Sequence, residues 1–255
     1  MENAYLLRLK TWISRSIADA RAGGAIGAKA GTARLKRQRI RPVSGGDPQQ
    51  LVILLHGRGA DGDDLIGVVP VLAKTLPHAA FVLPTAPQRC ETSPYTYEWF
   101  SLPDGDRHPD KVEAGVRAAA PVLDGFIDDE LAAHGLPDDR LALFGFSQGC
   151  MMALHVGLRR PNACAAILGY SGRLCAAESL FGEIASRPPV LLCHGTDDTT
   201  VPFEAQNLAA TAIEAAGVAV VTIERPGLGH RLDRKGIDAG AALLARTLVS
   251  PGGLD

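Results

Sequence analysis

Short, almost continuous apolar runs alternate with longer helix-like stretches from about residue 47 onward. Uninterrupted apolar runs are typical of parallel strands that are buried on both faces of a sheet. We predict strands at 51–55, 80–83, 141–146, 165–170, 190–193 and 219–223, and helices at 62–75, 110–134, 148–159, 203–216 and 235–248. This order predicts an α/β protein with a mostly parallel central sheet, helices on both faces, and functional residues at the carboxyl ends of the strands.

The length and composition favour one large domain. With 255 residues, of which 46% are hydrophobic, the chain can bury a core without metals or disulfides. Its five cysteines are odd in number and none are spaced C-x-x-C, which favours a reducing compartment, and we expect a cytoplasmic protein. An apolar run long enough to span a membrane is not found, and Arg8, Lys10 and Arg15 interrupt any secretory signal.

The charge is divided unevenly along the chain. Residues 1–46 hold 10 basic residues against two acidic ones, whereas residues 47–255 hold 16 basic against 26 acidic ones, so the formal net charge of −2 is the sum of two unlike parts. We therefore predict a basic, flexible N-terminal extension at 1–38 and a folded domain at 39–255. The acidic balance excludes nucleic-acid binding by the folded domain.

Three interpretations of the basic extension remain open. Apolar residues recur in it at helical spacing, which would suit an amphipathic helix on an anionic membrane or a partner: Leu6, Leu9, Ile13 and Ile17. Its arginine-rich, acid-poor composition also resembles an organelle transit peptide. Glycines at 23–31 would break a longer helix, which favours a tail, or an upstream start, without function.

The strongest chemical signal is the string G-F-S-Q-G, which directly follows the strand predicted at 141–146. Ser147 would lie there on a tight turn between a strand and a helix. Glycine is needed at both flanking positions because a Cβ would crowd the turn. The turn would expose the serine hydroxyl above the sheet, and the helix start would offer N–H groups to an oxyanion. We therefore predict a nucleophile, with a capping serine as the alternative.

A nucleophilic serine needs a base, and the base needs an acid. Downstream of Ser147, His155 falls on the next predicted helix and His194 ends a strand, whereas His230 lies in a glycine-rich loop after the last strand. His230 is therefore the predicted base. The acid is expected after the strand at 190–193, where Asp197 and Asp198 both qualify, and one of them could instead cap a helix.

A second oxyanion donor is expected after an early strand, where the chain reads H-G-R-G-A-D-G at 56–62. Glycines would let this backbone approach a substrate closely. A phosphate-binding loop is the alternative, but the string is not G-x-G-x-x-G and lacks the P-loop lysine.

Four separated stretches of the chain point to the same family: LLHGRGADGDDL, EWFSLP, GFSQG with HGTDDTTVP, and GLGH. Together they resemble the phospholipase/carboxylesterase family of α/β-hydrolases over roughly residues 40–250. The resemblance implies an α/β-hydrolase fold. It also implies that Ser147 is the nucleophile, that Asp198 is the acid because it is the fifth position of H-G-x-x-D-x-x-V-P, and that His230 is the base. The backbone N–H groups of Arg58 and Gln148 match the oxyanion hole.

The same resemblance marks two departures and one pocket element. The N-terminal extension, which the family pattern does not need, is one departure, and Arg58 is the other. Family members often carry a hydrophobic residue or tyrosine where this chain has Arg58, so a cation at the rim would alter substrate preference. Trp99 and Phe100 resemble a family element near the pocket, and we predict that Tyr97 and Leu102 join them there. A hydrophobic cluster that merely fixes a long loop is the alternative role for these side chains.

The activity expected is that of a serine carboxylesterase that works through a Ser-Asp-His triad and an acyl-enzyme. Acyl-protein thioesterase or lysophospholipase activity on the same triad is one alternative, and a catalytically silent binding module is another. We expect a small ester or thioester as substrate, no metal and no organic cofactor, and we consider a homodimer.

Overall fold

The computed structural model describes residues 35–91, 93–102 and 108–249. Within them lies a seven-stranded sheet of order β1-β3-β2-β6-β7-β8-β9, in which β1 runs antiparallel to β3 and every other neighbouring pair is parallel. Its strands are β1 (Arg37–Ile40), β2 (Gln50–Leu55), β3 (Ala79–Pro84), β6 (Leu141–Phe146), β7 (Ala166–Tyr170), β8 (Val190–Gly195) and β9 (Val220–Arg225). The sheet confirms the predicted α/β fold.

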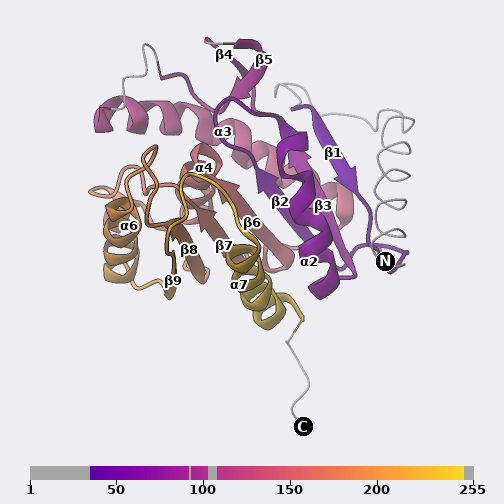
Figure 1. The fold of residues 1–255 in the computed structure, drawn as a ribbon. Coiled ribbons are helices and arrows are strands. Elements are labelled where there is room, and N and C mark those ends of the chain that lie inside the picture. Colours follow the sequence, from indigo (N-terminus) through magenta and orange to yellow (C-terminus); the bar gives the residue numbers. More distant parts are fainter. Residues whose placement is uncertain (1–34, 92, 103–107, 250–255) are drawn as a thin grey trace.

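Helices cover both faces of the sheet (Figure 1). One face packs against α3 (Pro109–His134), α4 (Gln148–Gly157) and α6 (Glu204–Ala215), and the other against η1 (Gly62–Val68), α2 (Val69–Thr75) and α7 (Arg234–Leu244). Strand β2 explains the continuous apolar runs: Leu51, Ile53 and Leu55 belong to the first core, and Val52 and Leu54 to the second. Because both faces are buried, the run from Leu51 to Leu55 is apolar at every position.

Local signals define where several helices begin and end. Pro109 opens α3, and Gly135 closes it in the left-handed conformation at φ 64°. Gly217, the predicted stop, follows α6 at φ 80° and donates its N–H to the carbonyl of Glu214. The Asp233 side chain caps α7 by accepting from the Gly236 N–H.

The structure adds elements that the sequence did not predict. The segment 84–109 between the strand predicted at 80–83 and the helix predicted at 110–134, here called the excursion, contains a two-stranded hairpin of β4 (Gln88–Cys90) and β5 (Ser93–Glu98). Strand β1 starts at Arg37, and Leu35 is already buried in the core, so the predicted boundary between residues 38 and 39 cuts through a strand. The extension ahead of Leu35, with its candidate helix, lies outside the described residues.

The strand order reverses beside β2. From β2 the chain moves to β3 on one side, and after α3 it returns to β6 on the other side. Ligand sites of open α/β sheets lie at such a switch point, beyond the carboxyl ends of the strands. Because Leu55 pairs with Gly145, the loop after β2 and the turn after β6 leave the sheet next to each other.

Candidate active site

Ser147 occupies a strained turn between β6 and α4. Its backbone has φ 54° and ψ −117°, which is a rare conformation for a residue with a Cβ. A Cβ on Gly145 would collide with the backbone of Gly149, and a Cβ on Gly149 would collide with the carbonyls of Leu55 and His56. The two glycines of G-F-S-Q-G therefore allow this turn to pack against the end of β2.

The structure brings Ser147, His230 and Asp198 together from three separate loops. His230 Nε2 lies 3.0 Å from Ser147 Oγ, and His230 Nδ1 lies 2.8 Å from Asp198 Oδ2. Phe146 stacks obliquely on the His230 imidazole, with the ring centroids 5.0 Å apart. These are hydrogen-bond distances, so a proton can pass from the hydroxyl to a histidine whose ring is held by a carboxylate.

The loops after β8 and β9 are joined by backbone contacts that bring the acid to the histidine. The Asp197 N–H donates to the carbonyl of Leu228, and the Thr196 N–H donates to that of Arg225. A Cβ on Gly195 would collide with the Leu228 carbonyl, so glycine permits this close approach. The Arg225–Asp233 ion pair, at 2.7 Å, closes the loop that carries His230.

Burial separates the two adjacent aspartates. The Asp198 side chain is fully buried, and its Oδ1 accepts from the N–H groups of Thr200 and Val201, each at 2.9 Å. Burial by itself raises the pKa of Asp198, but the hydrogen bonds from His230 and from this backbone outweigh it and hold the pKa below its usual value. Asp197 is exposed, and its Oδ1 accepts from the Thr196 hydroxyl.

The other two histidines downstream of Ser147 are buried within a strand and a helix. His194 is buried in β8, and its Nε2 lies 2.9 Å from the Val201 carbonyl and 3.3 Å from Asp198 Oδ2, so it supports the acid loop. His155 is buried in α4, where desolvation and then the positive charges of Arg159 and Arg117 lower its pKa to about 4. A histidine of that kind is neutral at pH 7.

The two proposed oxyanion donors flank Ser147. Gln148 is the first residue of α4, so its backbone N–H precedes the intrahelical hydrogen-bond ladder. Arg58 lies in the loop after β2, and this loop passes against the nucleophile: a Cβ on Gly57 would lie 3.2 Å from Ser147 Cβ. The Arg58 guanidinium binds Glu98 at the end of β5, with Nε 2.7 Å from Oε2.

Trp99 and Phe100 are buried in the core, whereas Tyr97 and Leu102 are half-buried against it. The Gln148 amide holds this segment, since its Oε1 accepts from the Trp99 N–H at 2.7 Å and its Nε2 donates to the Phe100 carbonyl at 2.8 Å. This burial fits the alternative of a hydrophobic cluster that fixes the loop. A pocket wall formed by these four residues stays a prediction.

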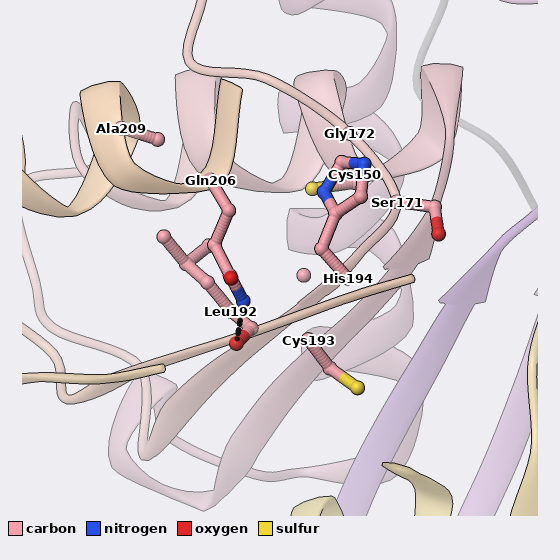
Figure 2. A pocket seen from close by; sticks show the side chains of 9 residues that line it. Cys150, Ser171, Gly172, Leu192, Cys193, His194, Gln206 and Ala209 are labelled. Carbon is pink, nitrogen blue, oxygen red and sulfur yellow. Dashed lines mark hydrogen bonds between the residues drawn. The ribbon is translucent and has the colours of Figure 1, made fainter. Parts of the chain in front are cut away.

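A narrow, mostly apolar pocket lies between α4, α6 and the ends of β7 and β8 (Figure 2). Gln206 crosses it and donates from Nε2 to the Leu192 carbonyl at 2.7 Å. Its walls are formed by Cys150, Gly169, Ser171, Gly172, Leu192, Cys193, His194, Gln206 and Ala209. The triad is not part of this lining, so we do not assign the pocket to substrate.

Sequence reasoning missed two side chains that hold the site. Glu98 was not distinguished from other charged residues of the excursion, although its position directly before Trp99-Phe100 was a signal. His56 lies at the end of β2 and accepts the Ala86 N–H on Nε2, and burial lowers its pKa.

Within 35–91, 93–102 and 108–249, acidic, histidine and cysteine side chains form no cluster of three that could hold a metal ion.

Comparisons with known proteins find related sequences and structures. The family model described as Phospholipase/Carboxylesterase matches residues 42–246. Acyl-protein thioesterase 1 of Schizosaccharomyces pombe is 36% identical over 160 residues, which cover 59% of this chain and 69% of the relative. Carboxylesterase SOBER1 of Arabidopsis thaliana is 30% identical over 196 residues, 72% of this chain and 84% of the relative.

Among solved structures, the crystal structure of esterase PE8 superposes with a TM-score of 0.82 at 40% identity. The match covers 85% of this chain and all of the esterase chain. The fold of this chain therefore resembles that of a solved structure named as an esterase.

Proposed function

Because this chain belongs to the phospholipase/carboxylesterase family and is a carboxylic ester hydrolase, we propose that it acts through a Ser147–His230–Asp198 triad and an acyl-enzyme. The observation that carries this proposal is the pair of hydrogen bonds on His230, 3.0 Å to Ser147 Oγ and 2.8 Å to Asp198 Oδ2. Buried, ionised Asp198 favours the tautomer with the proton on Nδ1, which leaves Nε2 free to accept the serine proton.

In the first half of the reaction, His230 Nε2 takes the hydroxyl proton while Ser147 Oγ attacks the acyl carbon. The carbonyl oxygen becomes an oxyanion, which accepts hydrogen bonds from the backbone N–H groups of Arg58 and Gln148. When the tetrahedral intermediate collapses, the alcohol or thiol leaves and takes the proton from His230. Asp198 stabilises the imidazolium throughout.

In the second half, a water molecule attacks the acyl-enzyme and gives its proton to His230. The carboxylic acid is released when the Ser147–acyl bond breaks and the serine recovers its proton. Apart from the substrate and this water, every group in the proposed cycle is a side chain or backbone N–H of the chain itself. It applies equally to esters and thioesters, and a relative named acyl-protein thioesterase supports testing both.

Replacing Ser147 by alanine tests the proposal. We expect Ser147→Ala to fold but to keep less than about 1% of the rate on p-nitrophenyl esters, because loss of a triad member costs about 10⁴-fold or more. It should also lose labelling by a fluorophosphonate probe, which a silent binding module would lack from the start.

Ser186→Ala is the control, since Ser186 is likewise a hydrogen-bonded serine, which is buried and bonds to the Gly157 carbonyl at 3.1 Å. It should keep both activity and labelling. Persistent activity in Ser147→Ala above about 1% would contradict the assignment. A series of p-nitrophenyl and acyl-thioester substrates of increasing acyl length would then establish the preferred substrate.

The cysteines support a further proposal on location. All five are free and buried. Burial raises the pKa of the Cys164 thiol to about 12 and that of the Cys175 thiol to about 11, so these thiols stay protonated and unreactive. We propose a reducing, cytoplasmic setting on this basis.

In the described part of the chain, the helices are too short or too polar to cross a membrane. A homodimer stays a prediction, which light scattering would test.

A further inference from the structure

The loop that carries Arg58 is anchored to the β4–β5 hairpin. Three hydrogen bonds join segments 56–60 and 97–99: Gly59 N–H to the Tyr97 carbonyl at 2.9 Å, Tyr97 N–H to the Ala60 carbonyl at 2.9 Å, and Trp99 Nε1 to the His56 carbonyl at 3.0 Å. These bonds hold the ends of the loop. The Gly57–Arg58 peptide has one further contact, since His56 Nδ1 lies 2.7 Å from the Gly57 carbonyl. The Arg58 side chain adds another.

That contact is an ion pair between Arg58 and a buried carboxylate. Glu98 is 1% exposed, and its Oε2 accepts from Arg58 Nε at 2.7 Å and from Cys90 Sγ at 3.7 Å. Its Oε1 has no hydrogen-bond partner among the described residues. The Arg58 side chain, at 27% exposed, still reaches solvent. Arg58 therefore supplies the cationic partner that a buried carboxylate needs.

The residues around Arg58 make this ion pair important for the backbone. Arg58 stands between Gly57 and Gly59, and Gly59 has a φ of 83°. Glycines on both sides restrict φ and ψ least, because they lack a Cβ, so the loop tip depends on its contacts for a fixed orientation. Those contacts are the Gly57 carbonyl with His56 Nδ1, the Gly59 N–H with the Tyr97 carbonyl, and the Arg58 side chain with Glu98.

We propose that Glu98 is a positioning residue for the oxyanion hole: its ion pair with Arg58 fixes the Arg58 backbone N–H beside Ser147. The inference rests on the proposed function, because it concerns one of the two donors assigned there. The second donor, Gln148, is held by the same segment through its hydrogen bonds to Trp99 and Phe100. One segment, 97–100, thus positions both donors.

Glu98→Gln tests the proposal with little change in side-chain volume. We expect kcat for p-nitrophenyl acetate to fall about tenfold, less than the 10²–10³-fold cost of losing a donor outright, because the N–H remains but is poorly placed. KM should stay within about twofold. The Ki of phenylboronic acid should rise about tenfold, because the tetrahedral serine adduct puts an oxygen in the oxyanion hole.

Glu130→Gln is the matched control. Glu130 is likewise a buried glutamate paired with arginine, 2.8 Å from Arg39, but it joins α3 to the edge strand β1. The substitution Glu130→Gln should lower the melting temperature and leave kcat and the boronate Ki unchanged. If Glu98→Gln behaved in the same way, Glu98 would be a stabilising residue only and the proposal would be wrong.

The double variant Arg58→Met/Glu98→Gln keeps the test valid if the single variant folds poorly, since it leaves no unpaired buried charge. Its kcat should lie within about twofold of that of Glu98→Gln, because the tether is already lost. A double variant that recovers the wild-type boronate Ki would overturn the proposal. If wild-type enzyme neither binds the boronate nor reacts with the fluorophosphonate, the triad assignment itself fails, which is a distinguishable result.

Discussion

At the scale of single residues, Ser147 is held in a conformation that its own backbone disfavours. A non-glycine residue at φ 54° and ψ −117° costs about 1–3 kcal/mol, which persists only where the surroundings impose it. Here the surroundings are the close contacts of Gly145 and Gly149 with neighbouring backbone. The strained turn places the half-buried Ser147 hydroxyl within hydrogen-bond distance of His230, as the proposed reaction requires.

The strain leads to a prediction about two inactive variants. Ser147→Gly should be more stable than Ser147→Ala by about 1 kcal/mol, because relief of about 1–3 kcal/mol of strain exceeds the 0.4–1 kcal/mol that glycine loses through its freer unfolded state. Chemical denaturation of both variants at pH 7 would measure the difference. A less stable glycine variant would mean that the turn is not strained.

Much of this site could be predicted from the residues. Ser147 is predicted by the local string G-F-S-Q-G, and His230 is predicted by its order and position in the chain. Both signals can be read directly from the sequence. The choice between Asp197 and Asp198 could not follow from spacing, since it depends on which carboxylate is buried beside His230. Glu98 was not predicted because its partner Arg58 lies 40 positions away, and only folding brings the two together.

At the scale of elements, the central strands were predicted to within about two residues because both of their faces are buried. Strand β1 was missed because its sequence R-Q-R-I has one buried side chain, Ile40. Its arginines are stabilised by Glu130, which lies 91 positions from Arg39. The four-residue helix α5 (Leu180–Glu183) was also missed, because it is too short to show a periodic pattern.

Helix α5 is joined to its neighbours through one carboxylate. Glu183 lies 2.9 Å from Arg117 of α3 and 2.7 Å from Arg159, just after α4. The hydrogen bond from Arg117 is the largest cause that lowers the pKa of Glu183 to about 2. A carboxyl whose pKa is lower in the folded state stabilises the fold above its unfolded pKa, and the stability disappears as the pH falls through the folded value.

Glu183→Gln should therefore lower stability in a pH-dependent manner. At pH 7 we expect a loss of about 1 kcal/mol or less, because the side chain is one-third exposed and solvent screens the pairs. The difference from wild type should shrink between about pH 4.5 and pH 2, which urea denaturation at pH 7 and pH 3.5 would measure. Glu178→Gln, in the same segment but exposed, should change little at either pH. A difference that is equal at both pH values would contradict the ion-pair interpretation.

At the scale of the whole molecule, the basic and acidic parts of the chain meet at β1. Residues 47–255 hold 26 acidic against 16 basic residues, while ten basic residues lie in 1–46. Two of these ten, Arg37 and Arg39, lie in β1 and pair with the fully buried Glu130 at 2.7 and 2.8 Å. Part of the positive charge of residues 1–46 therefore belongs to the folded domain and not to the segment ahead of it.

Two N-terminal deletions separate the fold from the preceding segment. Removal of residues 1–34 should leave the melting temperature unchanged and kcat/KM within about twofold, because Leu35, β1 and both ion pairs remain. Removal of residues 1–41 should lower the melting temperature, since it removes the buried side chains of Leu35 and Ile40 and both arginine partners of Glu130. Thermal unfolding and p-nitrophenyl acetate hydrolysis would measure both effects.

Binding to vesicles of anionic lipid then tests the segment before the fold. If the amphipathic pattern of Leu6, Leu9, Ile13 and Ile17 binds membranes, the full chain should co-sediment with the vesicles and the chain without residues 1–34 should not. Equal sedimentation of the two would exclude that role. Equal melting temperatures of the two deletions would instead show that β1 and its ion pairs do not contribute to stability, because only the longer deletion removes them.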